Sequence, residues 1–141
     1  AFLQMPSYFI DKTEVTNAQY NEFMDTTGYK PKWPKNFLKH WTKGTYPNGE
    51  ANHPVTYIDL SDTKAYAEWA GKEIPSEEKW QYAAQGTDGR AFPWGDLWDN
   101  KKANVSSSGT TAVGSFPEGA SPFGALDMAG NVSERGCPKS C

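Results

Sequence analysis

Residues 124–134 read GALDMAGNVSE. Two carboxylates, Asp127 and Glu134, lie on either side of Gly130, a residue that lets the chain turn tightly. Taken by themselves, these residues can be explained as turn formers: Asp127 and Glu134 would cap turns, and Asn131 would bond to the backbone. The stretch alone does not decide what further role they have.

Three helices are expected upstream of this stretch, because each has a start signal, an apolar face and a stop signal. The first has a capping box and the other two have a serine N-cap. A glycine follows each helix, as is common where a helix ends in a left-handed turn. The expected start and stop residues are Thr16 with Gln19 and Gly28, then Ser61 and Gly71, then Ser76 and Gly86.

The rest of the chain is expected to consist of loops and short strands. Residues 28–53 are rich in Pro, Gly, Lys and Trp without a sustained period, which predicts one long ordered loop. Short strands are expected near residues 55–58 and 112–116, and residues 8–10 are expected to form a short strand or an extended entry to the fold. The chain has 20 aromatic residues against 13 Val, Ile and Leu, so the core should be mainly aromatic. A length of 141 residues predicts a single domain over 1–141.

Charge limits the classes of partner. The net charge is −3, which gives no electrostatic reason to bind nucleic acid or to insert into an acidic membrane. Five lysines are scattered over residues 30–43 and are expected to form a solvated face. Four tryptophans, Trp33, Trp41, Trp94 and Trp98, are candidates for a carbohydrate or peptide surface. In an aromatic core, however, most of them should simply be packed.

Several short motifs follow one another in a fixed order along the chain. They are EVTNAQY (14–20), HPV (53–55), AYAEWAGK (65–72), IPSEEKWQYAA (74–84), FPWGD (92–96), AN (103–104), VGSFP (113–117) and DMAGNVSE (127–134). In this order they resemble the formylglycine-generating enzyme family, also called the sulfatase-modifying-factor family. The resemblance implies an α+β fold, a variant of the C-type lectin fold with little regular secondary structure, long ordered loops and structural calcium. It also favours an extracytoplasmic or secreted location.

The resemblance also assigns metal ligands. One family calcium site maps onto Asp127, the carbonyls of Gly130 and Val132, and Glu134. A second begins at Asn104 and the carbonyl of Val105, although the loop that should complete it, 106–111, contains no acidic residue.

Enzymatic members of the family oxidise a cysteine of a sulfatase-type peptide to formylglycine, using oxygen and a cysteine pair that binds copper(I) in aerobic enzymes. That pair lies some tens of residues beyond the position of Glu134. Here the two thiols are Cys137 and Cys141, which are weak candidates for a catalytic or copper site because spacing and position differ. We expect them to form a local disulfide or a crosslink, or to stay unreactive.

Three functional hypotheses follow from this comparison. The chain resembles a member that stops before the catalytic cysteine segment, which favours a non-catalytic, calcium-stabilised binding or structural module. Such a module would bind a protein, a peptide or a glycan on its loop surface, or self-associate. The alternative is a fragment of a formylglycine-generating oxidase, which would then use copper(I). A third is another oxidative role, for which two loop histidines, His40 and His53, are a poor basis.

Overall fold

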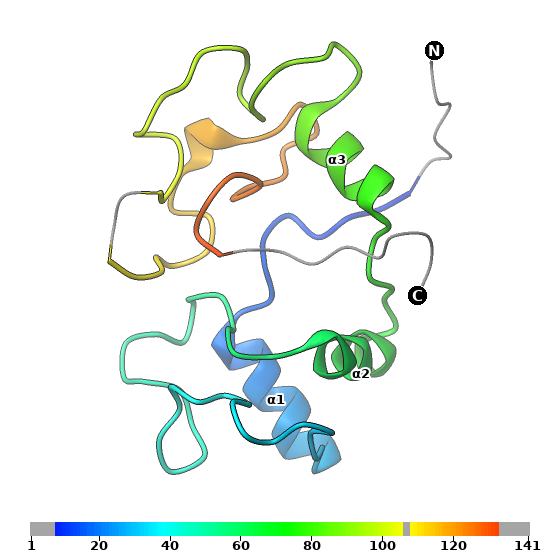
Figure 1. The fold of residues 1–141 in the computed structure, drawn as a ribbon, viewed down its shortest axis with the longest axis vertical. Coiled ribbons are helices and arrows are strands. Elements are labelled where there is room, and N and C mark those ends of the chain that lie inside the picture. The colour runs from blue at the N-terminus through cyan, green and yellow to red at the C-terminus, as the bar shows by residue number, and fades with distance from the viewer. Residues whose placement is uncertain (1–7, 106–107, 133–141) are drawn as a thin grey trace.

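The computed structural model describes residues 8–105 and 108–132. It contains three α-helices, α1 (Asn17–Thr27), α2 (Leu60–Ala70) and α3 (Glu77–Gln85), and one 3₁₀ turn, η1 (Pro117–Gly119). Helices α1 and α2 lie together at one end of the molecule with the loop 28–53, whereas α3 and residues 86–132 form the other end (Figure 1). Loops therefore make up most of the described chain, as predicted.

The ends of α1 and α3 lie at the capping residues that the sequence predicts. Helix α1 begins at the expected capping box: the Thr16 hydroxyl accepts from the Gln19 amide, and the Gln19 side chain accepts from the Thr16 amide. Gly28 ends it in the left-handed conformation. Helix α3 likewise has Ser76 as its N-cap and Gly86 at its end. These two predictions are confirmed.

The predicted cap of α2 is wrong by two residues. Its N-cap is Asp59, whose carboxylate accepts from the Asp62 amide while the Asp62 carboxylate accepts from the Asp59 amide. Ser61 lies inside the first turn, and its hydroxyl donates to Asp59 Oδ1 at 2.6 Å. Both residue types cap helices well, and the reciprocal pair of bonds favours Asp59. Gly71 ends the helix as expected.

The short strands expected near residues 55–58 and 112–116 are not formed. In the described ranges, extended segments pair only through isolated bridges: Thr16 with Pro54, Thr42 with Thr45, and Phe92 with Gly95. Tyr57 has a φ of 58° and Gly114 a φ of 73°, both in the left-handed region. A residue in that conformation interrupts the pleat of a strand, so neither segment forms a ladder.

The core has two parts, one at each end of the molecule. The first contains Tyr20, Phe23, Leu38 and Tyr66 and is mainly aromatic, as the composition predicted. The Tyr20 ring stacks on Tyr66 with centroids 5.7 Å apart and meets Phe23 edge-on at 5.2 Å. The second part is made of small and flexible side chains, Ala83, Ala84, Ala125 and Met128, with Trp80 packed against it.

Backbone bonds fix the long loop to α1. The amide of Asn17 donates to the His53 carbonyl at 2.9 Å, and the Asn17 side chain donates to the Glu50 carbonyl, also at 2.9 Å. Residue 52 is tied in turn to the other end of the molecule, because its carbonyl accepts from the Val113 amide at 2.8 Å. Segment 50–53 therefore links the two ends of the fold.

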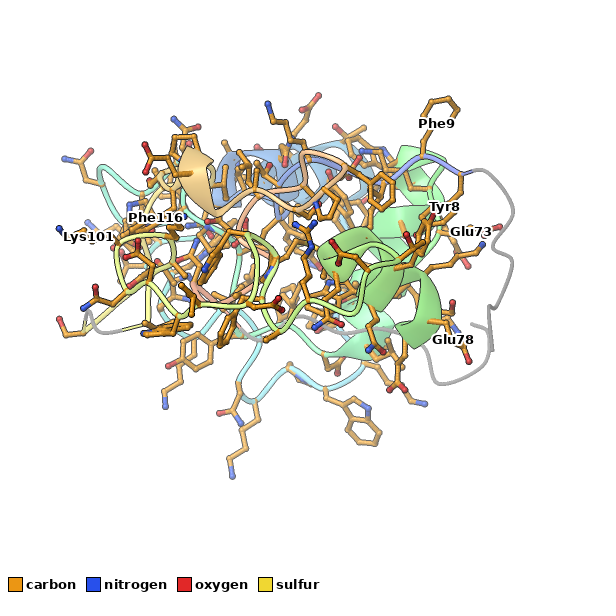
Figure 2. All side chains as sticks on the ribbon, turned by 90° about the horizontal axis from the view of Figure 1, so that it is seen from above. Tyr8, Phe9, Glu73, Glu78, Lys101 and Phe116 are labelled. Atoms are coloured by element: carbon orange, nitrogen blue, oxygen red, sulfur yellow. The ribbon has the colours of Figure 1, made fainter. Side chains whose placement is uncertain are left out.

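No helix within the described ranges is both long and apolar enough to cross a membrane. Some large apolar side chains are nevertheless exposed to solvent. Phe9, for example, projects away from the ribbon near the start of the described chain (Figure 2).

Candidate metal centre

The turn at residues 126–132 is built from left-handed residues. Asp127, Gly130 and Asn131 have φ angles of 55°, 87° and 63°. At Gly130 a side chain is also excluded by space, because a Cβ atom there would lie 2.6 Å from the Asn104 carbonyl oxygen. Glycine is therefore required at this position both for its backbone conformation and for the close approach of segment 104–105.

Asn131 ties four segments of the chain together at this turn. Its Oδ1 accepts from the Thr111 amide at 2.9 Å and from Asn104 Nδ2 at 3.2 Å. Its Nδ2 donates to Glu14 Oε1 at 3.1 Å and to the Thr111 carbonyl at 3.2 Å. Its backbone amide donates to the Asn104 carbonyl at 2.9 Å. The side chain of Asn131 is thus a structural junction rather than a free ligand.

Asp127 is the buried carboxylate of this turn. Its residue surface is only 5% exposed. Oδ2 accepts from the Gly114 amide at 2.8 Å, whereas Oδ1 is buried and has no hydrogen-bond partner. A buried carboxylate oxygen without a donor costs free energy unless a cation or a donor compensates it. This oxygen has the chemistry and the burial of a metal ligand.

The other predicted calcium ligands are partly described. The Gly130 carbonyl accepts from the Val132 amide at 2.9 Å and keeps a second lone pair. Val132 is the last described residue before the end of the turn, and Glu134 lies outside the described residues. Within the described ranges, no three His, Cys, Asp or Glu side chains converge on one point, so side chains of the described residues do not form a metal site by themselves.

The residues predicted for the second calcium site have a structural role. Asn104 Nδ2 donates to the Gly109 carbonyl at 2.9 Å as well as to Asn131, and the Asn104 carbonyl accepts from the Asn131 amide. Val105 is exposed and lies next to the undescribed residues 106–107. The second site remains a prediction.

A cleft of about 940 Å³ lies beside the turn. One wall comes from α3, with Trp80 and Ala84, and another from Phe92 and Pro93. Residues 127–132 form a further wall, which includes Asp127. The cleft therefore has a mixed lining: Trp80, Ala84, Phe92 and Pro93 are apolar, whereas Glu77, Gln81 and Asp127 are polar or charged.

The candidate cysteines and histidines do not belong to the described part of this turn. Cys137 and Cys141 lie outside the described residues. His53 Nδ1 is 2.9 Å from the Thr110 hydroxyl, which fits a residue that orders a turn. His40 packs on Tyr57 with ring centroids 5.3 Å apart, and burial lowers the pKa of its imidazole. The two histidines have different neighbours, and neither belongs to the turn at Asp127.

Two of the candidate tryptophans, Trp94 and Trp98, form a compact group with Phe92. Trp94 stacks on Phe92 with centroids 5.6 Å apart, and Trp98 meets Phe92 at 5.2 Å. The Trp94 indole donates to the Leu97 carbonyl at 2.8 Å. Trp94 is therefore mostly a packed residue. Trp33 and Trp98, however, are 66% and 49% exposed, so the expectation that most of the four candidate tryptophans are packed is not met.

Asp62 is a second deeply buried carboxylate and was not predicted from the sequence as a notable residue. It accepts from the Tyr29 hydroxyl at 2.7 Å and from the Asp59 amide at 2.9 Å. Burial raises the pKa of Asp62 above its usual value, whereas the hydrogen bond from Ser61 lowers that of Asp59. Burial, helped by Asp62, raises the pKa of Tyr29 to about 12. This group locks the start of the long loop to α2.

Comparison with protein families identifies the chain. The model of the sulfatase-modifying factor enzyme 1-like domain matches residues 2–136. The chain belongs to this family. Its relatives include the uncharacterized protein YfmG of Bacillus subtilis, 41% identical over 112 residues, which cover 74% of this chain and 23% of YfmG. The serine/threonine-protein kinase Pkn1 of Chlamydia trachomatis is 36% identical over 94% of this chain and 23% of its own length.

A third relative of this sulfatase-modifying-factor domain carries the name that the motifs suggested. The formylglycine-generating enzyme of Mycobacterium tuberculosis is 29% identical over 91% of this chain and 62% of its own length. The chain thus spans about a quarter of the first two relatives and somewhat less than two thirds of the third. The family assignment made from the motifs is confirmed.

Proposed function

We propose that this sulfatase-modifying-factor domain is a calcium-stabilised binding or structural module with a variant of the C-type lectin fold. The observation that carries the proposal is the buried Asp127 Oδ1, which has no hydrogen-bond donor. Family membership supports the lectin-like fold, and the loop-rich chain with three helices is compatible with it.

The residues around Asp127 fit a calcium ion. Ca²⁺ prefers about 6–8 oxygen ligands and tolerates irregular geometry. Asp127 would supply a carboxylate oxygen, Gly130 and Val132 would supply carbonyl oxygens, and Glu134 would supply a second carboxylate. The bonds of Asn131 hold the backbone of the turn in shape independently of any ion. Calcium would supply charge compensation for a buried anion.

The same residues favour binding over oxidation as the role of the described part. Residues 8–105 and 108–132 contain no cysteine, so a thiol-based oxidation would need Cys137, Cys141 or thiols from elsewhere. What these residues do offer is an ordered loop surface and the cleft beside α3. A protein, a peptide or a glycan is the proposed partner class. Self-association through exposed side chains such as Phe9 and Leu97 is a further possibility, which sedimentation velocity tests.

A second candidate function is that of an oxidase. It is supported by the similarity to the formylglycine-generating enzyme over 91% of the chain. In that case the protein, supplied with copper(I), would convert the cysteine of a sulfatase-type peptide to formylglycine. Mass spectrometry of the peptide after incubation tests this directly. Formation of the aldehyde would replace the module proposal with the oxidase.

The calcium proposal is tested by thermal unfolding in EGTA, in Ca²⁺ and in Mg²⁺. A bound ion stabilises by about 2.7 kcal/mol when its concentration is 100 times its Kd, so the melting temperature should rise with Ca²⁺ concentration. Asp127→Asn should abolish the rise while folding normally in EGTA, because an asparagine oxygen can still accept from the Gly114 amide.

The matched control is Asp25→Asn, which changes the same charge at an exposed position of α1. It should leave the calcium response intact. Two results would overturn the proposal: a wild-type protein whose stability ignores Ca²⁺, or an Asp127→Asn variant that keeps the full response.

A further inference from the structure

The loop 28–53 differs in charge from the rest of the chain. It contains five lysines, Lys30, Lys32, Lys35, Lys39 and Lys43, and one acidic residue, Glu50, although the whole chain has a net charge of −3. All five lysines are exposed, and none forms an ion pair within the described part of the chain. The remainder of the chain is therefore strongly acidic, and the loop 28–53 forms a positively charged surface on a protein whose net charge is negative.

Two of these lysines lie against exposed aromatic rings. Lys32 Nζ is 5.5 Å from the centre of the Trp33 ring, and Trp33 is 66% exposed. Lys39 Nζ is 5.9 Å from the centre of the Tyr57 ring, and Tyr57 is 53% exposed. Each pair places an ammonium group over an aromatic ring that is still more than half exposed to solvent.

The second pair is held in place by the backbone. Tyr57 adopts a φ of 58°, which is unfavourable for a bulky residue, and its carbonyl accepts from the Leu38 amide at 2.9 Å. Leu38 itself has a φ of 47° and is buried in the aromatic core. Strain of this kind persists only where the surrounding structure enforces it, and it often marks a binding surface. Here it fixes an aromatic ring at the surface next to Lys39.

We propose that these two lysine–aromatic pairs bind an acidic oligosaccharide. An acidic sugar has an apolar face formed by its ring C–H groups and a carboxylate or sulfate on the same ring. Its ring face can pack on an aromatic side chain while its anion binds the neighbouring ammonium. The loop 28–53 contributes a lysine to both pairs, Lys32 and Lys39, and two such pairs suit a polymer that repeats this unit. The inference deepens the proposed binding role and rests on it.

Other anionic partners match the surface less well. An acidic peptide supplies carboxylates but no flat apolar face beside each one. A nucleic acid supplies both features, but duplex DNA carries one charge per about 1.7 Å of helix axis. The chain as a whole has a net charge of −3, and α1, the helix to which the loop is fixed, carries the exposed acids Glu22 and Asp25, which disfavours such a dense polyanion. Acidic sugars carry at most a few charges per repeating unit and tolerate these neighbours better.

The test is isothermal titration with a tetramer of galacturonic acid, alongside its fully methyl-esterified form. The ester keeps the rings and removes the charge, so it should bind at least about tenfold more weakly. A sulfated oligosaccharide of equal length distinguishes sulfate from carboxylate as the preferred anion. Short peptides of glutamate and single-stranded oligothymidylate test the other two classes of polyanion.

Single substitutions test whether the acidic sugar binds at Lys32 and Trp33. Trp33→Ala and Lys32→Gln should each weaken binding of the acidic sugar by about tenfold, because each removes one half of a pair. Trp33 is mostly exposed, so its loss should leave the fold intact, which circular dichroism checks. Lys101→Gln is the matched control, because it removes the same charge from an exposed lysine outside the loop 28–53. It should leave the affinity unchanged.

The outcomes separate this inference from the calcium proposal. Binding of an acidic sugar that depends on Trp33 and Lys32 supports the inference even if calcium has no effect on stability. Absence of binding to both acidic sugars overturns it, even if calcium stabilises the protein. Equal binding of the methyl ester, tighter binding of polyglutamate or oligothymidylate, or an equal loss in Lys101→Gln also overturns it.

Discussion

Replacing Gly130 by alanine should destabilise the protein far more than the same change at Gly124. Both glycines have left-handed backbones, with φ angles of 87° and 83°. Alanine in that conformation costs about 1–2 kcal/mol at either position. At Gly124 a Cβ atom has no neighbour within 4 Å, whereas at Gly130 it lies 2.6 Å from the Asn104 carbonyl oxygen and 3.0 Å from Val105 Cγ1.

The extra cost at Gly130 comes from moving the Asn104 carbonyl. That oxygen accepts from the Asn131 amide at 2.9 Å, and a shift large enough to admit a methyl group breaks this bond. Loss of a buried hydrogen bond with an unsatisfied group left behind costs about 1–3 kcal/mol. Gly130→Ala should therefore lose about 2–5 kcal/mol in total, which is about 1–3 kcal/mol more than Gly124→Ala loses.

Urea unfolding followed by tryptophan fluorescence measures both variants, with equal m-values as the condition for comparing free energies. The measurement is made in EGTA, so that loss of a metal ion does not add to the difference. If the two variants lose the same free energy within about 0.5 kcal/mol, the close packing of segment 104–105 against the turn contributes nothing, and the reasoning fails.

Three further changes test other parts of the structure. Asp62→Asn tests the buried carboxylate. Because folding raises the pKa of Asp62, the stability that Asp62 contributes is fully present below its pKa in the unfolded chain and is lost as the pH rises through its pKa in the folded protein. The stability of wild type relative to Asp62→Asn in urea should thus improve as pH falls from 7 toward 4, and a flat or opposite trend would contradict this. Asn131→Ala should cost about 3 kcal/mol in thermal or urea unfolding, since it removes the side-chain bonds to Glu14, Asn104 and Thr111, and a loss below about 1 kcal/mol would exclude a junction. Thr16→Ala should cost about 1 kcal/mol through loss of the N-cap of α1, and unchanged stability would show that the capping box contributes little.

Helix positions could be predicted because their signals are local. Thr16 with Gln19 and Ser76 cap through residues three positions away, so the sequence alone contains the whole interaction. The cap of α2 was missed because Asp59 and Ser61 are both suitable caps. The reciprocal bond that decides between them comes from an aspartate at position 62, where the usual capping box has Glu or Gln.

The strands could not be predicted because distant contacts decide the backbone. Tyr57 leaves the extended conformation while its carbonyl bonds to Leu38, nineteen positions earlier, and no pattern within 55–58 indicates this. The same holds at Gly114, whose amide is bound by Asp127. The sequence predicted short strands at both places, where tertiary contacts favour a left-handed backbone instead.

The candidate metal centre was predicted only in part. Asp127 and Gly130 were identified from their motif, but the role of Glu14 was not, because its bond to Asn131 spans 117 positions. A useful signal was present: Glu14 begins the first motif of the series, EVTNAQY, yet no helix-capping role explains it. A polar residue at a motif boundary without a local role is a candidate for a long-range bond.

The two proposed roles, metal binding at Asp127 and sugar binding at the loop 28–53, belong to the two ends of this fold. Asn131 holds the turn at Asp127 through bonds to segments 14, 104 and 111, none of which belongs to the basic loop. The loop is fixed instead through Asn17, Leu38 and the bond from Val113 to residue 52. A metal ion at Asp127 would stabilise the first set of contacts without touching Trp33 or Tyr57. Stability and recognition can therefore change independently, which suits a family whose members carry names as different as a kinase and a formylglycine-generating enzyme.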